Sequence, residues 1–261
     1  MTDATTSRFL DVTELAGEKV SQEQVERLCH RYYWAGTYCA GRDVLEVACG
    51  SGPGLRYLAS RARSLQAGDY SPEVLAVARQ HVGADVDLRV FDAQVMPYAD
   101  TSFDVVIIFE ALYYVPLPER FVAEARRVLR PDGMLLIVNA NKDLFDFNPS
   151  PFSHQYHGVI ELRQLLTAAG FEPTFYGYVR VDQVSLRQRV LRPIKRLAVA
   201  LNLIPKTMAG KKMLKRLVFG RMTAMPESIT GDMVPYQPPE PISSHVADRT
   251  HKVIYCAATR R

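Results

Sequence analysis

The order of apolar and polar positions predicts strands that alternate with helices along most of the chain. Seven short apolar runs have strand length, and they occupy residues 44–47, 65–68, 86–91, 103–109, 134–138, 171–179 and 251–258. Segments with helical spacing begin after the N-cap residues Ser21 and Ser71, and further ones cover residues 118–129 and 161–169. Because such alternation is typical of parallel sheets, we predict an α/β fold with a doubly wound, mostly parallel, seven-stranded sheet.

The break after the first run is the strongest ligand-binding signal. Val44–Val47 leads into Ala48-Cys49-Gly50-Ser51-Gly52-Pro53-Gly54, and a helix is expected from there to about Arg63. Glycine permits positive φ and close approach of a ligand, and open α/β sheets bind ligands at such turns. A dinucleotide fingerprint needs a third small residue where Leu55 stands. The spacing therefore argues against a dinucleotide.

Five elements follow one another at a familiar spacing. They are Glu46 with Gly50-x-Gly52-x-Gly54, then Asp69, Asp92-Ala93, Phe103–Val106 and the predicted turn of Arg130–Gly133 after Leu129. In this order they resemble the motif series of class I S-adenosylmethionine (SAM) dependent methyltransferases, over roughly residues 44–179. The resemblance implies a Rossmann-like fold, SAM as cofactor and S-adenosyl-L-homocysteine as product.

The resemblance also implies roles for single residues. Asp69 would accept the ribose hydroxyls, and Asp92 with the backbone of Ala93 would contact the adenine. Glu46 would face the methionyl ammonium. The alternatives are a helix N-cap or a solvated turn for Asp69, a plain turn for Asp92, and a buried acid bonded by backbone N–H groups for Glu46. The further expected cofactor contacts are Ala48, where many members have glycine, with Gly50, Gly52, Tyr70, Phe109 and Tyr33.

Aromatic residues follow the first predicted helix at Tyr32, Tyr33 and Trp34. The resemblance implies a lid over the cofactor in this region, and an aromatic face attracts a cation such as a sulfonium. Core packing is the alternative role for these rings.

Methyl transfer to a hydroxyl needs alignment of the acceptor and a base that removes its proton. His154, with His157 as alternate, lies in the connection after the fifth predicted strand, and histidine titrates near neutral pH. Glu110 ends the fourth strand and either positions a ligand or caps the following turn. Packing of the lid is the alternative role for the histidine region. No pattern of metal ligands stands out, so we predict no metal.

Charge is distributed unevenly along the chain. Residues 180–222 contain twelve Lys and Arg but one acidic residue, Asp182, whereas the rest of the chain is acidic. Helical spacing over 186–204 and 211–222 predicts a basic helical cap inserted at 181–250. Three interpretations stay open. The cap is solvated, it receives an anionic acceptor, or residues 187–221 contact an anionic membrane surface or a nucleic acid. Of the last two partners, nucleic acid is disfavoured.

We therefore predict four parts along the chain: an N-terminal helical lid (1–42), a SAM-binding core (43–180), the cap (181–250) and a last core strand (251–261). The four cysteines form no pairing or zinc pattern, which favours a reducing compartment. Residues 1–8 are polar, unlike a signal peptide, and no apolar run is long enough to span a bilayer. We expect a cytoplasmic location, with peripheral contact at the inner membrane surface as an open alternative.

We therefore predict a SAM-dependent methyltransferase that acts on a hydroxyl of a small molecule or saccharide, with an amine acceptor left open. The alternatives are an NAD-dependent oxidoreductase and a non-catalytic SAM-binding or membrane-docked module. The oligomeric state and the acceptor are left open by the sequence.

Overall fold

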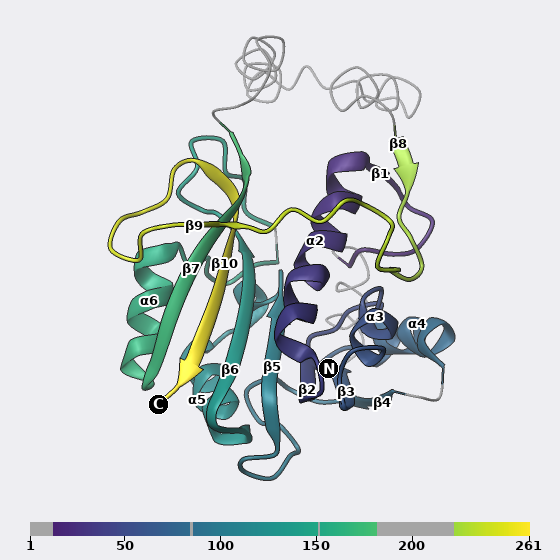
Figure 1. The fold of residues 1–261 in the computed structure, drawn as a ribbon, viewed down its shortest axis with the longest axis horizontal. Helices are drawn as coiled ribbons and strands as arrows, with labels where there is room; N and C mark the ends of the chain where they lie inside the picture. The colour runs from purple at the N-terminus through teal and green to yellow at the C-terminus, as the bar shows by residue number, and fades with distance from the viewer. Residues whose placement is uncertain (1–12, 84–85, 151, 182–221) are drawn as a thin grey trace.

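One central sheet with helices on both faces organises the protein (Figure 1). The computed structural model describes residues 13–83, 86–150, 152–181 and 222–261. The eight strands of the sheet run in the order β4-β3-β2-β5-β6-β10-β7-β9. Their bounds are β2 Asp43–Val47, β3 Ser64–Asp69, β4 Asp87–Val90, β5 Phe103–Phe109, β6 Leu129–Ala140, β7 Phe171–Arg180, β9 Glu240–Pro241 and β10 His251–Arg260. The prediction of a mostly parallel Rossmann-like sheet is confirmed, and the two-residue β9 adds an edge beyond the seven predicted strands.

The direction of the chain across the sheet changes between β2 and β5. Strands β2, β3 and β4 follow one another toward one edge, whereas β5 and β6 extend the sheet from β2 in the other direction, all in parallel. Strand β10 lies antiparallel between β6 and β7. Open α/β sheets bind ligands at the carboxyl ends of the strands where this reversal occurs.

Two apolar clusters sandwich the sheet because side chains alternate along each strand. Helices α2 (Gln22–Cys39), α3 (Leu55–Ala59) and α4 (Pro72–Val82) contribute to one cluster. Helices α5 (Pro118–Val128) and α6 (Val159–Ala168) contribute to the other, together with the short 3-10 helix η1 (Leu112–Tyr114). A central strand such as β5 is therefore buried on both faces, as its nearly continuous apolar run predicts.

The predicted helix starts are confirmed by their capping bonds. The Ser21 side chain accepts a hydrogen bond from the Gln24 backbone while the Gln24 side chain returns to Ser21, and Ser71 caps α4 through the backbone N–H of Val74. Helix α3 is shorter than predicted, since it ends at Ala59 rather than near Arg63. The chain needs the remaining residues to turn into β3.

The predicted turn at residues 130–133 lies inside strand β6. Phe103 pairs with Leu129 and Val105 with Met134, so β6 carries extra residues opposite β5. Asp132 adopts a φ of 62°, which lets the backbone fold out and rejoin the strand. The prediction was right about the local reversal but wrong in placing the strand only after it.

The cap predicted for residues 181–250 is described only in part. The expected helices over 186–204 and 211–222 lie outside the described residues, except that Met222 begins strand β8 (Met222–Ala224). In the described stretch 222–250 the chain forms β8, β9 and irregular segments rather than helices. Strand β8 pairs with β1 (Lys19–Ser21), and the Ile229 N–H donates to the carbonyl of Pro53, 2.8 Å away. This stretch therefore packs beside the glycine loop.

All four cysteines are buried and unpaired. Within the described part of the chain, no helix has the length and apolar character needed to cross a membrane. The same residues contain no cluster of three or more His, Cys, Asp or Glu side chains that could hold a metal ion.

Candidate active site

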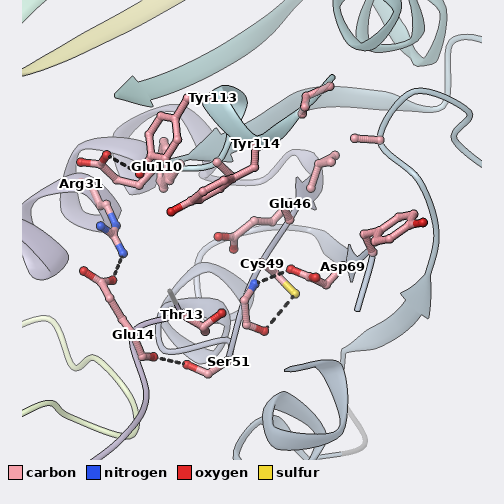
Figure 2. Close-up of a pocket in the computed structure, with 18 of the residues that line it drawn as sticks. Thr13, Glu14, Arg31, Glu46, Cys49, Ser51, Asp69, Glu110, Tyr113 and Tyr114 are labelled. Atoms are coloured by element: carbon pink, nitrogen blue, oxygen red, sulfur yellow. Dashed lines mark hydrogen bonds and ion pairs between the residues drawn. The ribbon is translucent and has the colours of Figure 1, made fainter. Parts of the chain in front are cut away.

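A cavity of about 520 Å³ opens at the carboxyl ends of β2, β3, β4 and β5 (Figure 2). Its volume is in the range of small-molecule and cofactor sites. Helix α2 and the segment that precedes it close one side, and the region after β6 reaches the rim through His154. The predicted site residues that line it are Glu46, Ala48, Gly50, Asp69, Tyr70, Asp92, Ala93, Phe109, Glu110 and His154.

The glycine loop has the backbone that its sequence predicts. Ala48, Gly50 and Gly52 all have positive φ, at 53°, 60° and 73°. This conformation is costly for a residue with a Cβ, which explains physically why the resembling family favours glycine at the position of Ala48. Gly52 does not line the cavity. A Cβ there would lie 2.9 Å from the side chain of Leu55, so Gly52 serves the turn and the packing against the helices.

Asp69 is held by the loop that it faces. Its Oδ2 accepts from the Gly50 N–H and its Oδ1 from the Ser71 N–H, each at 3.0 Å. Burial raises the pKa of this carboxyl, and the backbone N–H groups oppose the rise. One strand further along, Asp92 accepts from the backbone N–H of Gln94 at 2.8 Å. Both carboxylates are fixed before any ligand arrives.

Glu46 is a buried acid at the centre of the cavity wall. The hydroxyl of Tyr32 donates to its Oε1 at 2.6 Å, whereas its Oε2 has no hydrogen-bond partner among the described residues. Burial raises the pKa of Glu46 to about 7, against the opposing effects of Tyr32 and Arg31. A buried acceptor without a donor is costly, so this carboxyl is suited to a ligand that brings a donor or a positive charge.

Glu110 is engaged on both oxygens. Its Oε1 accepts from Arg27 at 3.0 Å. Its Oε2 accepts from the Ala140 N–H at 3.0 Å and from the Tyr113 hydroxyl at 3.2 Å. Glu110 itself has a φ of 50°. These bonds join α2, η1 and β6 around the cavity. The two roles that the sequence leaves open for Glu110, positioning a ligand and capping the following turn, both stay open.

The aromatic residue predicted to contact the cofactor, Tyr33, lies away from the cavity. Its hydroxyl donates to the carbonyl of Thr230 at 2.6 Å, while its neighbour Tyr32 faces the cavity instead. Successive helix residues point about 100° apart, so only the docking of α2 selects between them.

The two candidate histidines differ in their surroundings. His157 is buried outside the cavity lining, and burial lowers its pKa. His154 lies exposed at the rim, where its backbone N–H donates to the carbonyl of Tyr113 at 2.8 Å. This bond attaches the backbone at His154 to η1. Of the two candidate histidines, His154 lines the cavity and His157 does not.

Several cavity residues were missed by the sequence analysis. Glu14 lines the cavity from the segment before β1, and its carbonyl accepts from the Ser51 hydroxyl at 2.6 Å. Arg27 and Arg31 are spaced four residues apart on α2 and both line the cavity, with Arg31 labelled in Figure 2. Charged residues at such spacing within an apolar helix face are a signal that could have found them. The other missed lining residues include Thr13, Gln94, Tyr113 and Tyr114.

Comparison with known proteins identifies this arrangement. Residues 45–137 match the family model described as "Methyltransferase domain". These residues belong to the class I SAM-dependent methyltransferase superfamily. The match covers the strands that carry the glycine loop, Asp69, Asp92 and Glu110. The predicted family is confirmed, and with it SAM as the cofactor of the methyltransferase domain.

Curated relatives resemble about half of the chain. A protein of Mycolicibacterium smegmatis named "Probable S-adenosylmethionine-dependent methyltransferase" is 37% identical over 151 residues, which are 56% of each chain. The phthiotriol/phenolphthiotriol dimycocerosates methyltransferase 1 of Mycobacterium ulcerans is 38% identical over 129 residues, 46% of each chain. The chain spans about half the length of the curated relatives that it matches, so their activities are not transferred to it directly.

Solved structures share the fold of the methyltransferase domain. The YcgJ protein from Bacillus subtilis aligns with a TM-score of 0.56 at 18% identity, over 89% of this chain and 98% of the other. The [4+2]-cyclase SpnF aligns with the same TM-score at 20% identity, over 95% of this chain and 88% of the other. At this identity the likeness concerns the fold, and the name of the second protein shows that this fold is not limited to one reaction.

The residues of the methyltransferase domain fit SAM. The unpartnered Oε2 of Glu46 suits an ammonium, and Gly50 lines the cavity with a positive φ that favours glycine. Asp69, Asp92 and Ala93 line successive strand ends of the same cavity, where the resemblance implies contacts with the ribose and the adenine.

Proposed function

We propose that the chain is a SAM-dependent methyltransferase that transfers a methyl group to a hydroxyl of a small molecule. The observation that carries the proposal is the convergence of Glu46, the glycine loop, Asp69 and Asp92 on one cavity that also reaches His154. Cofactor residues and a candidate base therefore share one space. SAM supplies a methyl group on a reactive sulfonium, so the chain's own residues have to bind, orient and remove a proton.

His154 is the residue proposed as general base. It lies at the rim of the cavity, and its segment is attached to η1 through the backbone of Tyr113. Two carboxylates of this region are engaged, Glu110 with Arg27 and Tyr113, and Asp69 with the loop. A rim histidine can accept a proton from an acceptor hydroxyl and release it to solvent. His157 is no longer favoured, because it lies outside the cavity lining.

The cavity supports a neutral acceptor more than an anionic one. The cationic side chains that the structure shows in its lining are Arg27, which is paired with Glu110, and Arg31, which is paired with Glu14 beside the glycine loop where the amino-acid end of the cofactor would lie. Neither is left for an anionic acceptor. Apolar and aromatic residues form much of the remaining wall. The M. ulcerans relative is named for phthiotriol and phenolphthiotriol. An alcohol or phenol is therefore our first choice, and saccharides and amines remain to be compared with it.

The basic segment bears on the other interpretations. Residues 187–221, proposed to contact a membrane, lie outside the described residues, as does the 182–221 part of the cap that was considered for an anionic acceptor. Peripheral membrane contact thus stays a proposal that liposome co-sedimentation can test. The oxidoreductase alternative loses its basis, because the glycine loop lies in a domain of the SAM-dependent superfamily.

Titration calorimetry with S-adenosyl-L-homocysteine, followed by turnover assays with a panel of phenols, alcohols, saccharides and amines, tests the function. We expect binding of the homocysteine product and release of the same product from SAM with a hydroxyl acceptor. The His154→Ala variant should lose about 10²- to 10⁴-fold in kcat with its cofactor affinity retained. His245→Ala, at an exposed histidine away from the cavity lining, is the matched control.

Three results would count against all or part of the proposal. Absence of binding to both SAM and its product would remove the enzyme assignment. Full activity of His154→Ala at neutral pH would dismiss this base while leaving methyl transfer intact. Binding without turnover on any acceptor would instead favour the non-catalytic SAM-binding module.

A further inference from the structure

A charged pair closes the cavity on the side that faces Glu46. Arg31 from α2 is almost fully buried, with 8% of its side chain exposed, and its guanidinium bonds the carboxylate of Glu14, which is 36% exposed. The Arg31 Nε is buried without a hydrogen-bond partner among the described residues. Figure 2 shows Arg31 reaching Glu14 beside the space into which Glu46 points. The pair therefore belongs to the cavity and is not a surface contact.

Glu14 reaches this place because its segment lies against the glycine loop. The Ser51 hydroxyl donates to the Glu14 carbonyl at 2.6 Å. The Thr13 side chain would lie 3.5 Å from a Cβ built on Gly50. A carboxylate of the chain is thus held at the loop where the amino-acid end of a cofactor would lie.

The two walls together present the complement of an amino-acid zwitterion. Glu46 offers a carboxyl with an unpartnered oxygen to an ammonium. Arg31 offers a planar guanidinium, which binds a carboxylate through parallel N–H donors. We propose that Arg31 binds the methionyl carboxylate of the cofactor and that Glu14 occupies this position until the cofactor displaces it. This inference rests on the proposed function for the identity of the ligand.

The exposures decide which partner moves. Glu14 is partly exposed and can turn to solvent at low cost, whereas Arg31 is buried and would be left as an unpaired interior charge. Two carboxylates near one guanidinium repel each other, so the incoming carboxylate replaces Glu14 rather than joining it. A ligand that lacks a carboxylate cannot replace Glu14 as the partner of Arg31. The pair therefore selects for the complete amino-acid end of the cofactor.

Calorimetric affinities for two ligands test the inference. S-Adenosyl-L-homocysteine carries the amino-acid end, whereas 5′-methylthioadenosine retains the nucleoside and thioether without it. We expect Arg31→Met to weaken binding of the first ligand about 10- to 100-fold, the loss of hydrogen bonds to a charged group. Glu14→Gln should tighten the same ligand about 3- to 10-fold, because a neutral amide competes less well for the guanidinium. Neither variant should change binding of methylthioadenosine more than about twofold.

Glu18→Gln serves as the matched control, since Glu18 is exposed on the same segment and does not line the cavity. It should leave both affinities unchanged. Should Arg31→Met fail to fold, Glu14→Gln carries the test alone, because its position is partly exposed. The opposite directions of the two variants distinguish competition from a merely structural ion pair.

The proposal is overturned if Glu14→Gln weakens or leaves unchanged the binding of S-adenosyl-L-homocysteine. It is likewise overturned if both ligands respond equally to Arg31→Met. If the wild-type protein binds S-adenosyl-L-homocysteine and the variants bind it equally well, the proposed function stands and only this inference is wrong. A wild-type protein that binds neither ligand removes both.

Discussion

At the scale of single residues, the site depends on carboxylates whose surroundings differ. Asp69 has both oxygens bonded to backbone N–H groups, whereas Glu46 keeps one buried oxygen unpartnered among the residues that the structure describes. Asp69 is therefore arranged without a ligand, and in our proposal the ligand ammonium supplies the donor that Glu46 lacks. The two carboxyl groups differ in their surroundings, because the backbone N–H groups of Gly50 and Ser71 bind Asp69 whereas one oxygen of Glu46 is buried without a donor.

Asp69→Ala should weaken binding of S-adenosyl-L-homocysteine by about 2–3 kcal/mol, because it removes charge-assisted hydrogen bonds to the ribose. Calorimetry measures this change, with a thermal unfolding curve to show that the loop still folds. Asp87→Ala is a suitable control, since Asp87 lies on the exposed part of β4. Unchanged affinity in Asp69→Ala would contradict the ribose assignment.

At the scale of elements, local signals set the starts of helices and tertiary contacts set several of their ends. Ser21 and Ser71 cap their helices as predicted, because a capping bond joins residues three positions apart. The end of α3 and the bulge in β6 escaped prediction. Both depend on how the chain meets a neighbouring strand, which local sequence does not contain.

The packing of α2 on the glycine loop gives a prediction at this scale. A Cβ on Gly54 would lie 2.1 Å from the Tyr32 ring, so the helix needs a glycine beneath it. Gly54→Ala should lower the free energy of unfolding by about 1–3 kcal/mol, as overpacked cores do. Chemical denaturation measures it. Gly231→Ala, where the nearest atom would be 3.6 Å away, is the control and should cost much less.

An equal loss in the two glycine variants would mean that the Tyr32 contact is not what constrains Gly54. A larger loss of cofactor affinity in Gly54→Ala would accompany the expected result, since Tyr32 also bonds Glu46.

At the scale of the whole molecule, the cavity joins segments that are far apart in the sequence. The segment before β1, helix α2, the ends of β2 to β5 and the region after β6 all reach it. Burial by these segments together raises the pKa of Glu46 to about 7. The proton affinity of one side chain is thus a property of the assembled protein.

Cofactor binding should therefore depend on pH near neutrality. Ionised Glu46 attracts the ligand ammonium, and the ionised form increases as pH rises through its pKa of about 7. The affinity for S-adenosyl-L-homocysteine should rise as the pH is raised through this value, with release of a proton that calorimetry in two buffers can detect. Glu46→Gln should flatten this dependence. The same slope in wild type and Glu46→Gln would assign the dependence to another group.

The same pKa has a consequence for the unliganded protein. The pKa of Glu46 is 4.5 as a free group and about 7 when folded, so between these values the folded state binds the extra proton. The contribution of Glu46 to the free energy of unfolding is greatest below a pH of about 4.5 and is lost as pH rises through about 7. A bound ammonium reverses this loss, because it favours the ionised carboxyl.

Local sequence was enough to predict the succession of strands and helices along the chain, the glycine loop and the acidic residues at the strand ends. These follow from local periodicity and from backbone conformations that only certain residues adopt cheaply. Tertiary structure decided which side chains share the cavity. Tyr32 rather than Tyr33 lines the cavity, His157 lies outside the cavity lining, and Glu14 pairs with Arg31. These positions depend on how α2 and the segment before β1 pack against the sheet, and local sequence does not reveal that packing.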